Sequence, residues 1–207
     1  MNGMESAVAI GSDVHKEVVA KLEEYEGRAS HFYLDSVGKV TVGVGHMILN
    51  RTLVARIQMC KGTAAGPGQA ATFEEKQQEY DRIAAQPRGY KASWYEKHAI
   101  LIMRESEINS LRDHHIAEFY GELTRIYSRA RGCKSDFDQF PKAVQLALFD
   151  MIFNLGAKKL VSTFVQFDRR IREANWSKAA EGCSRTQVSA SRNEYVRKLL
   201  LGAGAGK

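Results

Sequence analysis

Glu26, Asp35 and Thr41 are the three residues of this chain whose types and spacing best suit acid chemistry on a bound water. Glu26 ends a segment with apolar residues at helical spacing, Asp35 opens a turn, and Thr41 lies in a valine-rich strand pattern. A carboxylic acid can protonate a leaving oxygen while a carboxylate and a hydroxyl hold the attacking water. Glycosidic bonds are commonly hydrolysed in this way.

A helix followed by a hairpin is expected to position these groups. The pattern predicts a helix over 14–26, with Gly27 in the left-handed position that follows a helix. Because valines alternate with Thr41 in the strand, we expect Thr41 on the opposite face, toward an open cleft. Partial negative charge at the helix C-terminus favours a protonated Glu26, whereas Asp35, among the amides of its turn, should stay ionised.

This part of the sequence resembles the phage-type lysozymes, which are muramidases of the bacterial cell wall. The matched positions are Glu26, Gly27, Tyr33, Asp35, Gly38, Thr41, Gly43, Gly45 and His46. The resemblance implies that Glu26 is the general acid and that Asp35 and Thr41 hold the attacking water. It also implies a lysozyme-like α+β fold, in which a cleft separates a small N-terminal helix and β-hairpin lobe from a larger all-helical C-terminal lobe.

The expected organisation is a single domain with one insertion. Its predicted parts are an N-lobe at about 12–49, an insertion at about 50–97, a helical lobe at about 98–201 and a flexible tail at 202–207. The insertion contains a glycine-rich loop at 62–69, and the pair Thr72 and Glu75 predicts a capping box. This segment would shape the cleft, cover it or recognise a partner. Within it, Trp94 and Tyr95 would stack on sugar rings or lie in the core.

Four further residues are expected to bind substrate, namely Met47, Phe153, Asn154 and Arg192. Phe153 and Asn154 end an apolar helix whose last residues are similar to the family's central helix, which implies a place along the sugar-binding cleft. Asp150 and Asn154 are the polar exceptions of that helix, so one or both should face the cleft or cap backbone. Arg192 resembles, by position, an arginine that faces the acid in related enzymes, whereas as a plain helix residue it would be a surface charge.

Composition is ordinary for a globular protein, with 44% hydrophobic and 26% charged residues. The net charge of +6 suits a polyanionic cell wall. Nucleic acid is not expected as a partner, because the basic residues are spread along the chain and no recognition motif is present. The sequence has no apolar run of membrane-spanning length, and we expect no Sec-type leader. Cys60, Cys133 and Cys183 are interpreted as reduced packing residues, with one disulfide as the alternative in an oxidising compartment.

The sequence therefore predicts a cofactor-free glycoside hydrolase that cleaves between N-acetylmuramic acid and N-acetylglucosamine in peptidoglycan. No metal site is expected, because the histidines lack ligand spacing. The alternative is a non-catalytic peptidoglycan-binding or interaction module on the same fold. We expect synthesis in the cytoplasm and action at the wall of a target cell, after release through a holin or dedicated secretion. An immunity protein and a secretion apparatus are the other partners considered.

Overall fold

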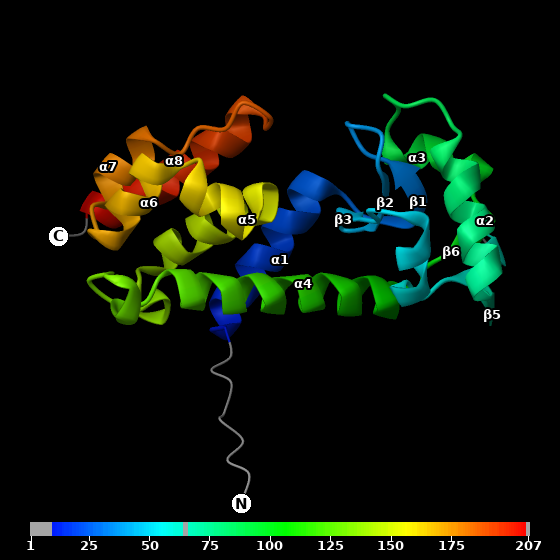
Figure 1. Cartoon of the computed structure of the whole chain (residues 1–207), viewed down its shortest axis with the longest axis horizontal. Helices are drawn as coiled ribbons and strands as arrows, with labels where there is room; N and C mark the ends of the chain where they lie inside the picture. Colours follow the sequence, from blue (N-terminus) through cyan, green and yellow to red (C-terminus); the bar gives the residue numbers. More distant parts are fainter. Residues whose placement is uncertain (1–9, 64–65, 206–207) are drawn as a thin grey trace, which may run out of the picture. The chain divides into compact units, whose positions relative to one another are not determined.

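The computed structural model describes residues 10–63 and 66–205. These residues form helices together with two small antiparallel sheets, so the predicted α+β class is confirmed (Figure 1). They divide into two compact units, each of which is described by itself. One unit, Leu22–His114, contains both sheets, and the other, made of 10–21 and 115–205, is helical.

The boundary between the units differs from the predicted lobe boundaries. Helix α1 (Ser12–Glu26) and helix α4 (Glu105–Ile126) each contribute residues to both units. The predicted insertion at 50–97 lies in the same compact unit as the hairpin, and the first part of α4 belongs there as well. The helical lobe predicted to begin at 98 therefore begins later, within α4.

The first sheet carries the hairpin and has the strand order β1, β2, β3. Its strands are β1 (Ala29–Leu34), β2 (Val40–Gly43) and β3 (His46–Met47). Thr41 is paired with Tyr33 on one side and with Met47 on the other. Side chains directly opposite one another share a face of the sheet, so Thr41 lies between Tyr33 and Met47.

The prediction that Thr41 faces an open cleft is wrong, because Thr41 is only 2% exposed. The valines of β2 are buried on one face, as expected from alternation. The other face is covered too, since Ile108 and Leu111 of α4 each lie 3.7 Å from where a Cβ on Gly43 would be. The strand is therefore buried on both faces.

The second sheet replaces the predicted glycine-rich loop. Its order is β5, β4, β6, and its strands are β4 (Cys60–Thr63), β5 (Gly66–Ala70) and β6 (Leu101–Ile102). A Cβ at Gly68 would lie 2.8 Å from the carbonyl oxygen of Lys61, so glycine permits a close approach of two backbones here. Glycine in this segment thus serves strand pairing. Residues 64–65 of the predicted loop lie outside the described residues.

The other elements of this unit are short helices around the sheets. They are the 3-10 helix η1 (Arg51–Arg56), α2 (Phe73–Ala84), α3 (Ala92–Tyr95) and the 3-10 helix η2 (Glu96–His98). The predicted capping box is confirmed, because Glu75 N donates to Thr72 Oγ1 at 3.2 Å and Thr72 N donates to Glu75 Oε2 at 2.9 Å. Tyr95 is fully buried, which confirms the core interpretation for that residue.

The helical unit is built around α5, whose apolar residues are buried on nearly all sides. Its elements after α4 are η3 (Arg129–Arg131), η4 (Phe137–Gln139), α5 (Lys142–Ser162), α6 (Val165–Arg172), α7 (Trp176–Glu181) and α8 (Ala190–Ala205). Gly156 adopts a φ of 70° and interrupts α5, which agrees with the predicted end of the core helix at this glycine.

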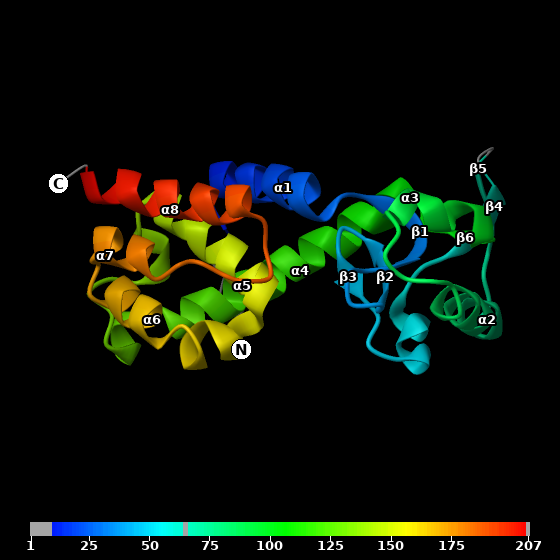
Figure 2. The same ribbon diagram turned by 90° about the horizontal axis from the view of Figure 1, so that it is seen from above.

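The prediction of a flexible tail at 202–207 is wrong for residues 202–205, which continue helix α8. Helix α8 packs on α5 and α7 (Figure 2). A Cβ at Gly204 would collide with the side chain of Ser177 and lie 3.4 Å from its backbone nitrogen. The absence of a side chain at Gly204 therefore allows close helix packing, which overrides the low helix propensity of glycine. Residues 206–207 lie outside the described part.

The three cysteines are buried and unbonded, as expected of packing residues. Burial raises the pKa of the Cys133 and Cys183 thiols. Over residues 10–63 and 66–205, no helix has the length and apolar character needed to span a membrane.

Candidate active site

Glu26 is the last residue of α1, and its half-buried side chain lies against a glycine of the hairpin. Gly27 follows with a φ of 73° and ends the helix in the left-handed conformation. A Cβ at Gly45 would lie 3.2 Å from Glu26 Oε2 and 3.3 Å from both Cβ and Cγ of Glu26. The absence of a side chain at Gly45 therefore makes room for the Glu26 carboxyl group.

The turn at 35–38 fixes one oxygen of Asp35. Asp35 Oδ1 accepts hydrogen bonds from Val37 N at 2.9 Å and from Lys39 N at 2.8 Å. Gly38, with a φ of 81°, donates its N–H to the Asp35 carbonyl at 3.0 Å. Because both side-chain bonds go to Oδ1, Oδ2 is the oxygen left for other partners, and the half-buried carboxylate has a defined orientation.

Thr41 donates its hydroxyl to the carbonyl oxygen of Lys39 at 3.1 Å. That bond ties Thr41 to the same short turn that holds Asp35. A threonine oxygen has two acceptor lone pairs, so Thr41 Oγ1 can still accept a hydrogen bond from water. Its neighbour on β3, Met47, is 42% exposed, which places the predicted substrate-binding residue at an accessible edge of the sheet.

Tyr33 links the two carboxylic acids. Burial first, and then the negative charges of Glu26 and Asp35, raise the pKa of Tyr33 to about 12. Both acids are therefore within electrostatic range of one phenol, although they belong to different elements. Sequence reasoning matched Tyr33 to the family but gave it no role. The available signal was its place on β1, two residues before Asp35.

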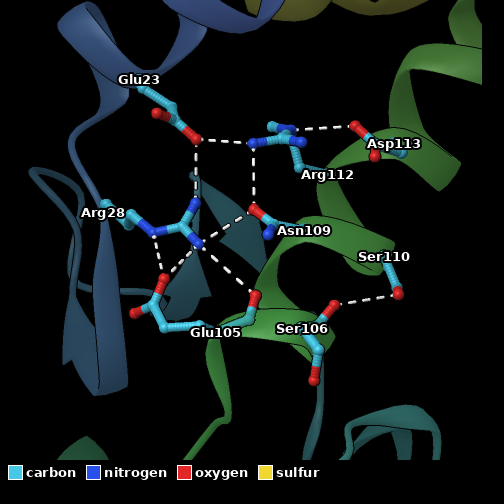
Figure 3. A network of polar contacts seen from close by, with 8 residues as sticks. All are labelled: Glu23, Arg28, Glu105, Ser106, Asn109, Ser110, Arg112 and Asp113. Atoms are coloured by element: carbon cyan, nitrogen blue, oxygen red, sulfur yellow. Dashed lines mark hydrogen bonds and ion pairs between the residues drawn. The ribbon is translucent and has the colours of Figure 1, made fainter.

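The last turn of α1 is held to the start of α4 by a network of charged groups (Figure 3). Glu23 Oε1 accepts from Arg28 Nη1 at 2.8 Å and from Arg112 Nη1 at 2.7 Å. Arg28 also donates to Glu105 Oε2 through Nε at 3.0 Å, and both arginines donate to Asn109 Oδ1. We call Glu23, Arg28, Glu105, Asn109 and Arg112 the α1–α4 clamp.

The α1–α4 clamp encloses the position of Glu26 in sequence, since Glu23 precedes it by one helical turn and Arg28 follows the end of the helix. Burial alone would lower the pKa of Arg112, but its hydrogen bonds to Asp113 and Glu23 raise it. The Arg112 guanidinium therefore stays charged at any physiological pH. The clamp therefore attaches the helical turn that carries Glu26 to α4.

Phe153 and Asn154 lie in the helical unit, on α5. Phe153 is half-buried and packs edge to face on Phe119, with ring centroids 5.5 Å apart. Asn154 is exposed. Their predicted contact with substrate stays a prediction.

Arg192 also lies in the helical unit, where it is 6% exposed and pairs with Asp150. Its Nε lies 2.9 Å from Asp150 Oδ2, and Arg185 Nη1 lies 2.7 Å from Asp150 Oδ1. The alternative interpretation of Arg192 as a surface charge is therefore wrong. Asp150 thus pairs with two buried arginines, although its Oδ1 accepts no hydrogen bond from the described residues. These residues lie too far apart in sequence for spacing to predict the pairing.

The described residues contain no cluster of three or more His, Cys, Asp or Glu side chains suited to a metal ion. His31 is buried, and its Nε2 lies 2.9 Å from the carbonyl oxygen of Ala92, which is a structural contact. Comparison of the chain with models of protein families and with curated proteins gives no match.

Proposed function

We propose that this protein is a peptidoglycan hydrolase that cleaves the glycosidic bond between N-acetylmuramic acid and N-acetylglucosamine. The observation that carries the proposal is the joint effect of Glu26 and Asp35 on the Tyr33 phenol. It supports an arrangement in which a helix-end acid and a turn carboxylate, both close to one tyrosine, act on the same bond.

In the proposed reaction, Glu26 donates its proton to the glycosidic oxygen as the bond to the anomeric carbon breaks. Asp35, through Oδ2, and Thr41, through Oγ1, orient a water whose oxygen attacks that carbon. Asp35 takes up the proton that the water loses. A single displacement of this kind inverts the anomeric configuration. Met47, Phe153, Asn154 and Arg192 are the proposed substrate-binding residues, and no cofactor or metal is required.

The test is release of reducing ends from purified peptidoglycan by the intact chain and by Glu26→Gln. The amide keeps the shape of the side chain but removes the transferable proton, so we expect a loss of at least about 100-fold. Glu24→Gln, which changes an exposed glutamate of the same helix, is the matched control and should keep its activity. A folded Glu26→Gln variant with near-normal activity would refute the proposal.

A non-catalytic peptidoglycan-binding module is the second candidate. It is favoured by one observation, the 2% exposure of Thr41, which leaves little room for a water beside its hydroxyl. Such a module would bind peptidoglycan without releasing reducing ends, and Glu26→Gln would leave binding unchanged. In either case we propose the bacterial cell wall as the partner, reached after holin release or dedicated secretion. An immunity protein is a further proposed partner.

A further inference from the structure

Tyr90 has an exposed aromatic face that the proposed reaction does not use. Tyr90 is 49% exposed and stacks on Trp94, with ring centroids 4.2 Å apart and an interplanar angle of 13°. Lys97 Nζ lies 4.3 Å from the centroid of the Trp94 ring. The His98 ring also lies close, with its centroid 4.7 Å from that of Trp94, so several groups pack around the Trp94 ring. The outer face of Tyr90 is the one left open.

Arg88, two residues before Tyr90, contacts the turn that holds Asp35. A Cβ on Gly38, within that turn, would lie 3.3 Å from Cδ of Arg88, so the Arg88 side chain rests on the turn. Because two residues of chain span at most about 7 Å, the backbone of Tyr90 lies within about 7 Å of the backbone of Arg88. The segment that follows packs on the hairpin as well, because His31 of β1 contacts the carbonyl of Ala92.

Three cations without a hydrogen-bond or ion-pair partner among the described residues lie in this segment and in the Asp35 turn. Over residues 10–63 and 66–205, the side chains of Lys39, Arg88 and Lys91 have no hydrogen bond or ion-pair partner, and Glu96 is the only acid between 87 and 98. Five other cations of the same unit are paired with carboxylates, namely Arg28, Arg51, Lys61, Arg82 and Arg112. A carboxylate-bearing ligand would find these unpaired cations available.

We propose that the open face of Tyr90, with Arg88 and Lys91 beside it, binds a sugar ring of an acidic wall glycan. The flat ring offers apolar contact to the C–H face of a sugar, and its stacking on Trp94 holds it in place at little entropic cost. The cations receive carboxylates carried by the glycan. The site lies on the segment at 50–97 and would extend substrate contact beyond the Asp35 turn. This inference rests on the proposed function for the identity of the glycan.

The test measures binding of the full chain to purified peptidoglycan sacculi by co-sedimentation, with Glu26→Gln present in every variant so that no substrate is consumed. We expect Tyr90→Ala to weaken binding about five- to tenfold, and Tyr90→Phe to leave it nearly unchanged. The matched control is Phe73→Ala, which removes another exposed aromatic ring of the same unit, 47% exposed. It should have no effect.

The charge contribution has its own pair of variants. Arg88→Glu should weaken binding severalfold and reduce its salt dependence, whereas Arg56→Glu, the same change at another exposed cation of this unit, should do neither. Equal binding by Tyr90→Ala and the parent overturns the proposal, as does an equal loss in Phe73→Ala. Circular dichroism and thermal unfolding verify that each variant is folded.

The outcomes separate this inference from the proposed function. If the chain with Glu26 intact releases no reducing ends but sacculus binding still depends on Tyr90, the hydrolase proposal fails and the binding site stands. If reducing ends are released and Tyr90→Ala binds normally, the binding site fails and the hydrolase stands. Failure of the Glu26→Gln parent to bind sacculi also overturns the binding site.

Discussion

Gly45 and Glu26 are in such close contact that a single methyl group at Gly45 should disturb the carboxyl group. Gly45→Ala would place its Cβ 3.2 Å from Glu26 Oε2 and force alanine to a φ of 70°. The left-handed conformation costs about 1–2 kcal/mol. We expect a loss of stability of that size and a fall in reducing-end release of about tenfold or more, because the acid is displaced.

The control for Gly45→Ala is Gly132→Ala. Gly132 also has a positive φ, of 85°, but a Cβ there would meet no atom within 4 Å. This variant should lose similar stability in a urea titration and keep its activity. If both variants lose activity in proportion to stability, the contact between Gly45 and Glu26 has no role in catalysis.

The position of Tyr33 beside two acids can be tested by measuring how the stability of the protein changes at alkaline pH. Its pKa is raised to about 12, so the folded state favours the neutral phenol. The stabilisation is complete below the ordinary tyrosine pKa of about 10 and is lost as pH rises through about 12, a difference of roughly 3 kcal/mol at most. Urea titrations at pH 9 and pH 11.5 should show a smaller decline in Tyr33→Phe than in the parent. Equal declines would contradict this assignment.

At the residue scale, the sequence predicted what local patterns determine. The C-terminal end of α1, the Asp35 turn and the capping box at Thr72 depend on neighbouring residues, and the structure contains all three. The start of α1 at Ser12 lies two residues before the predicted start at 14. The burial of Thr41 and the pairing of Asp150 with Arg192 depend on contacts between distant segments. Spacing within one element carries no signal for such contacts.

The α1–α4 clamp gives a prediction at the scale of elements. Glu23→Gln removes the charge that Arg28 and Arg112 share. We expect a loss of about 1 kcal/mol in stability, because the groups are only partly buried. We also expect kcat to fall severalfold at unchanged KM, since the last turn of α1, which carries Glu26, loses its attachment to α4. Glu23 is thus a positioning residue.

Glu17→Gln is the matched control for the α1–α4 clamp. It removes another glutamate of α1, whose Oε1 lies 2.5 Å from Nζ of Lys142 within the helical unit. This variant should cost similar or less stability and leave kcat unchanged. If Glu23→Gln raises KM but leaves kcat unchanged, the clamp does not position the acid.

Among the helices and strands as well, those that depend on local sequence were predicted and those that depend on distant contacts were not. The helix-and-hairpin order was predicted because it follows from periodicity and turn residues. Strands β4 and β5 and the end of α8 were not, because glycine was interpreted as a source of flexibility. At Gly68 and Gly204 it instead permits close approach to a distant backbone. Only the folded structure shows which distant residue lies so close to a glycine that a larger side chain would not fit there.

For the whole molecule, the net charge of +6 predicts how hydrolysis of an anionic polymer depends on salt. Raising ionic strength from about 0.1 M to about 1 M shortens the Debye length from about 10 Å to about 3 Å, which screens attraction between the basic surface and the wall. We therefore expect the rate of lysis of sacculi to fall severalfold over this range, through slower association and shorter residence.

A short uncharged glycan substrate separates this effect from a change in the catalytic groups. Its hydrolysis should vary much less with salt, because net charge no longer assists its encounter with the protein. The two substrates are compared at the same pH, with rates measured as reducing ends released. An equal salt effect on both would place the ionic interaction within the active site, and no effect on sacculi would show that the basic surface does not contribute to substrate binding.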